Sequence, residues 1–135
     1  RRQKELIVLN ETELRVLDGN FSDLPEGTSF LEPDHAFAED LDLFGPDSFF
    51  QYLNRTGLAT GTTKLAKWLG SNTVDEIPAR QQAIRELASL TGWRQEFMAT
   101  ARLIADLGLD GIKLHLLVYG EDEVDVELEV RLKRV

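Results

Sequence analysis

From residue 46 to residue 108 the chain repeats one pattern: apolar residues spaced by three and four, interrupted by residues that typically begin or end helices. Pro46 suits the first position of a helix, because its ring presets φ and it lacks a backbone N–H. Gly70 suits the position just after a helix, and Thr73 followed by Glu76 has the spacing of a capping box. The pattern predicts a small helical domain. The residues expected to pack in its interior are Phe49, Phe50, Leu53, Trp68, Leu69, Ile84 and Leu87.

The first 45 residues predict a different organisation. Residues 3–17 have the apolar spacing of an amphipathic helix. A loop-rich connection is expected after it, because Pro25, Gly27 and Pro33 interrupt regular structure. The aromatic residues scattered along this connection are expected to anchor it onto the helical core; they are Phe21, Phe30 and Phe37.

The last 27 residues, 109–135, change period. From Val124 onward apolar and charged residues alternate strictly, which is typical of a half-buried strand. A second alternating run lies upstream, and Gly120 with the acidic residues after it suits a turn between the two. The sequence therefore predicts a mostly α fold with a C-terminal β-hairpin, an α+β class, in three regions: 1–45, 46–108 and 109–135.

The charge is unevenly distributed. The net charge is −9, and from Val16 to Asn54 the chain has nine carboxylates and no Lys or Arg. Since nucleic-acid binding depends on clustered cations, this stretch should repel DNA. Arg55, Lys64 and Lys67 form a basic group near the helices and are the candidate phosphate contacts. A solvated helix face is the commoner explanation for three such charges.

No pattern indicates catalysis. The chain has no Cys and two histidines, His35 and His115. Neither histidine belongs to a recognisable triad, and no phosphate-binding loop ending in Lys-Ser/Thr is present. The acidic loop could supply metal ligands through His35, Glu39, Asp40 and Asp42. It lacks the calcium-loop spacing, so solvated charges are favoured. We predict no catalytic, cofactor-binding or metal-binding residue and no enzymatic activity in this chain.

Four segments appear in an order that resembles the MutS mismatch-repair family, where the parts that grip DNA join the ATPase. The stretch AEDLDLFGPDSFFQYLNRT (38–56) is similar to the entry of the family's core domain. Thr56 and Gly61 match a T-x-T-x-x-G turn, although Leu58 stands where a second Thr is usual. KLAKWL (64–69) and ARQQAIRELA (79–88) are similar to the two helices that follow.

The resemblance implies a non-catalytic core fragment that couples ATP state to DNA binding in a longer parent protein. The absence of an initial Met agrees with a fragment. ATP and Mg²⁺ would be bound elsewhere in that parent, DNA would be its partner, and a homodimer of the parent is a further expectation. The expected location is cytoplasmic, with membrane association of the parent left open. The alternative is an acidic protein-interaction module without a DNA role, favoured by the charge balance and the amphipathic tail.

Overall fold

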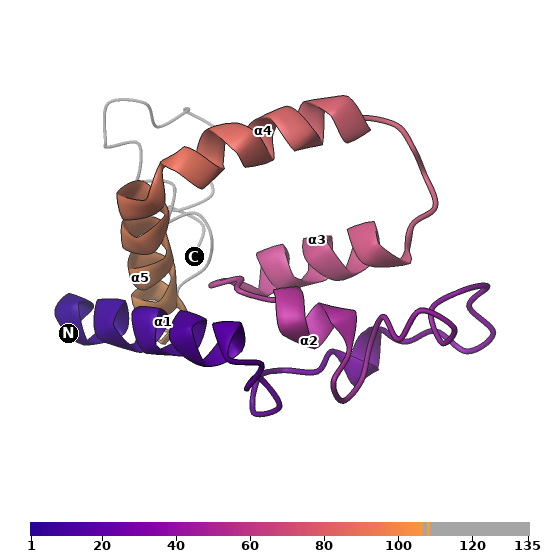
Figure 1. Cartoon of the computed structure of the whole chain (residues 1–135), viewed down its shortest axis with the longest axis horizontal. Helices are drawn as coiled ribbons and strands as arrows, with labels where there is room; N and C mark the ends of the chain where they lie inside the picture. The colour runs from indigo at the N-terminus through magenta and orange to yellow at the C-terminus, as the bar shows by residue number, and fades with distance from the viewer. Residues whose placement is uncertain (107, 109–135) are drawn as a thin grey trace, which may run out of the picture.

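The computed structural model describes residues 1–106 and 108 of the chain. Within them the backbone forms five α-helices and one short 3₁₀ turn, connected by loops (Figure 1). None of the described helices is long and apolar enough to cross a membrane. In chain order the elements are α1 (Arg2–Leu17), η1 (Thr28–Phe30), α2 (Phe49–Leu53), α3 (Ala59–Gly70), α4 (Ile77–Ser89) and α5 (Thr91–Asp106).

The predicted α+β class is corrected by this structure. The part of the chain that is described contains helices and no strand. The strand prediction rested entirely on alternating residues in 109–135, which lie outside the described residues. Alternation over a short run indicates a local preference, and the fold class follows from the elements that pack together. For residues 1–106 the fold is all-helical.

Helix α1 lies against α5, and this pair forms the largest helix–helix packing among the described residues (Figure 1). Helix α1 buries Leu9 and Val16, while α5 buries Ala99, Ala101 and Ile104. Two polar contacts also join α1 to α5. Arg2 forms an ion pair with Glu96, and Gln95 Nε2 donates to Asn10 Oδ1 at 2.9 Å.

The long connection between α1 and α2 folds around one phenylalanine. Phe50 is fully buried, and its ring centroid lies 5.5 Å from that of Phe30 and 5.6 Å from that of Phe44. Gly27 presses against the same ring, so closely that a Cβ there would lie 2.4 Å from Phe50 Cδ1. Phe21 packs edge-on against Tyr52. The anchoring role predicted for Phe21 and Phe30 is confirmed.

The start of α2 differs from the prediction. Pro46 was expected at the first helical position, but the helix begins at Phe49. Asp47 adopts a left-handed conformation with φ of 56°, which interrupts a helix. Ser48 then caps the helix, since its Oγ accepts from the backbone N–H of Gln51 at 3.2 Å. The capping box at Thr73 is also absent: α4 begins at Ile77, after a left-handed Glu76.

The residues that we expected in the interior differ in their burial in the structure. Phe50 is buried and Leu69 is half-buried. The other five are exposed, so the expectation that they pack inside this chain is corrected. The physical reason is that few contacts join α4 to the other described helices, and its largest set of helix contacts is with α5. The exposed five are Phe49, Leu53, Trp68, Ile84 and Leu87.

Candidate functional site

The predicted phosphate contacts do not form one basic patch. Arg55 Nε donates to Glu13 Oε1 of α1 at 3.0 Å, and the Arg55 side chain is only 20% exposed. Lys64 places its ammonium 5.3 Å from the centre of the Trp68 ring. Lys67 lines a different cavity from the one that Arg55 lines. Arg55 is therefore already neutralised by a carboxylate, which leaves it poorly placed to hold phosphate.

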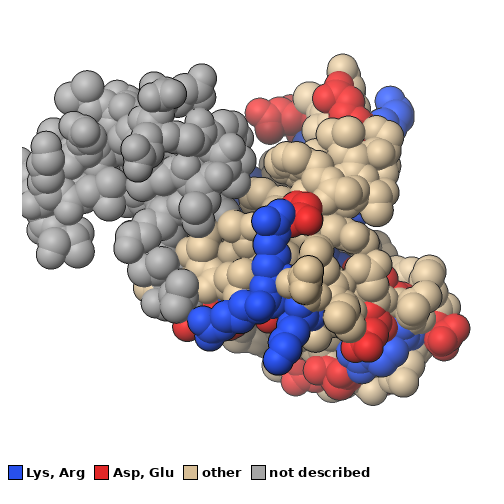
Figure 2. Space-filling model, turned by 90° about the vertical axis from the view of Figure 1, so that its left-hand side faces the viewer, with Lys and Arg blue, Asp and Glu red and all other residues tan. Residues whose placement is uncertain are grey.

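A different group of cations lies at the start of α1. The end that carries the N-terminus and α5 displays a group of Lys and Arg side chains (Figure 2). The three cations that begin α1, Arg1, Arg2 and Lys4, are all exposed. The acidic connection that follows α1 extends away from this end (Figure 1). Carboxylates also lie at the cationic end, where Arg2 forms an ion pair with Glu96.

Residues 54–62, which connect α2 to the first turn of α3, form a hydrogen-bonded turn. Asn54 Oδ1 accepts from the backbone N–H of Thr56 at 3.1 Å and from its hydroxyl at 2.6 Å. The hydroxyls of Thr56 and Thr62 lie 2.6 Å apart, and Thr62 also donates to the Leu58 carbonyl. The network fixes the direction in which α3 leaves the turn.

This turn, which we call the 54–62 junction, also contacts both α1 and α5. Arg55 reaches α1 through its bond to Glu13. Gly57 lies so close to α5 that a Cβ there would be 2.8 Å from Met98 Sδ and 2.9 Å from Ala101 Cβ. Leu58 packs against the buried Ala101 and Ile104 of α5. The sequence indicated a turn through Thr56 and Gly61, but the roles of Asn54 and Gly57 had no recognisable signal.

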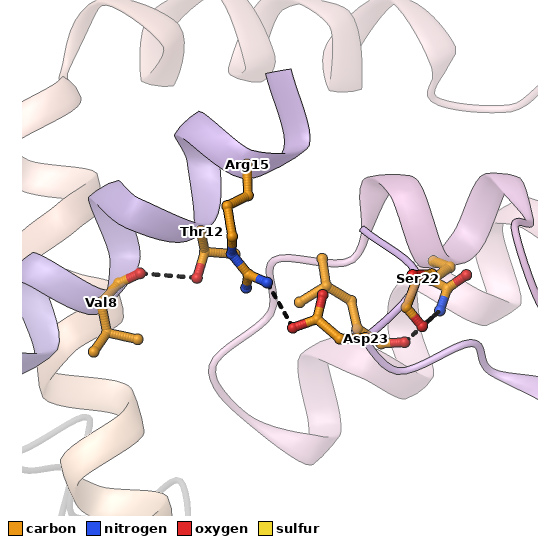
Figure 3. Close-up of polar contacts among 7 residues, drawn as sticks. Val8, Thr12, Arg15, Ser22 and Asp23 are labelled. Atoms are coloured by element: carbon orange, nitrogen blue, oxygen red, sulfur yellow. Dashed lines mark hydrogen bonds and ion pairs between the residues drawn. The ribbon is translucent and has the colours of Figure 1, made fainter. Parts of the chain in front are cut away.

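A second set of contacts fastens the acidic connection to α2. Gln51 is 2% exposed, and its Nε2 donates to the backbone carbonyls of Ser22 and Leu24 at 3.1 and 2.5 Å. Its Oε1 accepts from the backbone N–H of Asp47 at 2.7 Å. Figure 3 shows how Ser22 is brought beside α2 and how the adjacent Asp23 faces Arg15 of α1. The connection is therefore held at both of its ends.

His35 joins the connection to the end of α3. Its Nδ1 accepts from the backbone N–H groups of Phe37 and Ala38, and its Nε2 lies 2.8 Å from the Gly70 carbonyl. A carbonyl can only accept, so Nε2 carries the proton. The bond satisfies one of the carbonyls left free at the end of a helix. A cavity of about 410 Å³ lies beside it, lined by Phe30, Phe44 and Lys67 among others.

The structure gives His35 this packing role. Within residues 1–106 and 108, no three or more His, Cys, Asp or Glu side chains come together in a way that could hold a metal ion. His115 lies outside the described residues.

The ion pair between α1 and the connection predicts a pH effect. Arg15 Nη1 donates to Asp23 Oδ2 at 2.7 Å, and this bond, with the charge of Arg15, lowers the pKa of the Asp23 carboxyl from its ordinary value of 3.8. Because the pKa of Asp23 is lower in the folded protein than in the unfolded one, the ionised carboxylate stabilises the fold. This stabilisation is fully present above about pH 3.8 and disappears as the pH falls through the folded-state pKa. We expect the urea midpoints of wild type and Asp23→Asn to converge below pH 3.8. A gap that stays constant down to pH 2 would contradict the pairing.

Comparison with known proteins gives one partial similarity. A stretch of 62 residues is 36% identical to the DNA mismatch repair protein MutS of Myxococcus xanthus. The match covers 44% of this chain and 7% of that protein, so the chain spans less than a tenth of the relative's length. No family model matches the chain. No solved structure matches it. The comparison supports a MutS-like segment within the chain.

Proposed function

We propose that this chain is a non-catalytic core segment of a MutS-like mismatch-repair protein, where it transmits conformational change between the parts that bind ATP and DNA. The partial identity to MutS supports the parent function. ATP and Mg²⁺ would be bound outside the described residues, and DNA would be the partner of the whole protein. This segment itself would transmit conformational change and would bind neither ATP nor Mg²⁺.

The observation that carries the proposal is the 54–62 junction. A segment that transmits movement must hold its helices in a fixed relation while its neighbours shift. The junction contacts α1 through Arg55 and α5 through Gly57 and Leu58, and its hydroxyl network sets the start of α3. A displacement of α1 or α5 would therefore be passed to α3 through one turn.

The test is made in a longer MutS-like protein that contains this segment. Thr56→Val keeps the shape of the side chain but removes the hydroxyl that bonds Asn54 and Thr62. We expect basal ATP hydrolysis to stay within about twofold of wild type, while the change in hydrolysis caused by DNA falls by roughly 5- to 150-fold, the effect that corresponds to a typical coupling free energy. The measurement is steady-state hydrolysis with and without mismatched duplex.

Thr60→Val is the matched control for this experiment, because Thr60 lies on the first turn of α3 and is exposed. It should leave both the basal rate and the DNA effect unchanged. If Thr56→Val also leaves the DNA effect intact, the junction does not transmit the signal. If it lowers basal hydrolysis as much as the DNA-dependent part, the junction supports the fold of the parent and the coupling role is excluded.

A further inference from the structure

Helix α4 is the least buried of the four long helices in the described chain. None of its residues is buried, whereas α1, α3 and α5 each bury at least one. A helix of this length is only marginally stable in water by itself, since helices in proteins gain most of their stability from packing. Parts of a fold with few buried contacts are those that open locally. Helix α4 therefore has the features of a segment that opens while the rest stays folded.

Both ends of α4 are breaks in the helical backbone. At its start Glu76 has a left-handed conformation with φ of 63°. At its end Leu90 has φ of −97° and ψ of 51°, and α5 begins at the next residue. Figure 1 shows α4 crossing from the start of α5 to the loop that leads back to α3. These two residues suit hinges, because a few residues at the ends of an element can absorb a change in its direction.

Arg80 connects α4 to α3. It is half-buried, and every other residue of α4 is exposed. Its guanidinium carbon lies 5.2 Å from the centre of the Trp68 ring, within the range of a cation–π contact. Arg80 Nη2 also donates to the Asp75 carbonyl at 2.9 Å, which restricts the position of the guanidinium. The contact with Trp68 thus joins the first turn of α4 to the last turns of α3.

We propose that α4 opens on its two hinges independently of α1 and α5, and that the contact of Arg80 with Trp68 is the latch that keeps it closed. Helix α4 connects the end of α3 to the start of α5, whereas the 54–62 junction fastens the start of α3 to α5. Opening of α4 therefore leaves the junction intact. The inference goes beyond the proposed coupling role and does not depend on it, because it concerns the motion of this chain itself.

Native-state hydrogen exchange of the 135-residue chain tests the independent opening. Amide exchange is followed residue by residue by NMR at several low urea concentrations. We expect the α4 amides to be protected at least about tenfold less than those of α5. Their exchange should also depend less than about half as steeply on urea, because opening one helix exposes less surface than global unfolding. Equal protection and equal urea dependence in α4 and α5 would mean that the two helices open together, and the inference would be overturned.

Arg80→Ala tests the latch. An exposed cation–π contact of ordinary strength predicts that the α4 amides exchange about two- to fivefold faster in this variant, with no change in α5. Arg85→Ala is the matched control, because Arg85 is an exposed arginine of the same helix. A cation in the first turn of a helix is unfavourable, so loss of the Arg80 charge alone would slow exchange. The latch is excluded if Arg80→Ala leaves α4 exchange unchanged or slower, or speeds it no more than Arg85→Ala does.

A double variant separates the Trp68 contact from the bond between Arg80 and Asp75. Trp68→Leu keeps a large apolar side chain but removes the ring that the guanidinium faces. We expect Trp68→Leu to speed α4 exchange by a factor similar to that of Arg80→Ala, and the double variant to show no further increase. If the two factors multiply, the residues act separately, and the assignment of the latch is overturned.

Discussion

Phe50→Ala is expected to destabilise the protein by about 3–5 kcal/mol, the range typical of a buried phenylalanine. Phe50 is fully buried between the rings of Phe30 and Phe44, with the backbone of Gly27 against its edge. Truncation would leave a cavity where the acidic connection meets α2. Urea unfolding followed by circular dichroism gives the free energy of unfolding for the comparison with wild type.

The neighbouring residue provides the control. Phe49 lies on the same short helix but is 48% exposed, so Phe49→Ala should cost less than about 1 kcal/mol. The two variants have the same change in composition and differ in burial alone. An equal loss of stability for both would show that α2 is rotated about its axis relative to the structure, and the packing of the connection would have to be assigned again.

Most of the helices could be predicted from the sequence. The spacing of apolar residues predicted helices over 3–17 and 46–108, and α1, α3, α4 and α5 lie in these ranges. The start of α2 could not be predicted, because it depends on the left-handed conformation that Asp47 adopts in the packed loop. Local preference placed Pro46 at the helix start, and tertiary contacts moved the start to Phe49.

Which apolar residues are buried was harder to predict. An amphipathic pattern shows that one face of a helix is apolar, but it does not show what covers that face. For Phe50 the covering residues come from the distant connection, and for Ile84 no described element covers the side chain. The same pattern thus gave a buried residue in one helix and an exposed one in another.

Most of the polar contacts in the candidate site could not be predicted from the sequence. Thr56 and Gly61 could be recognised as a turn, because hydroxyl and glycine residues favour turns. Gln51 could not be recognised, since a glutamine inside a short helix is ordinarily a surface residue. Its role depends on two carbonyls that lie 27 and 29 residues away in the chain.

Gln51→Met is expected to destabilise the protein by about 2–4 kcal/mol. Met has nearly the length and volume of Gln, so the packing of α2 is retained while three hydrogen bonds disappear. The three bonds to Ser22, Leu24 and Asp47 are partly buried, and each such bond contributes a net of about 0.5–1.5 kcal/mol. The free energy of unfolding in urea measures the total loss.

Amide hydrogen exchange then separates the hydrogen bonds from packing. The N–H of Asp47 donates to Gln51 Oε1, so its exchange should become faster in Gln51→Met than the change in global stability alone would produce. Gln81→Met is the matched control, because Gln81 is exposed on α4, and it should leave the unfolding free energy within about 0.5 kcal/mol of wild type. If Gln51→Met behaves like Gln81→Met, the connection is held by Phe50 and its aromatic neighbours, and the buried amide contributes no net stability.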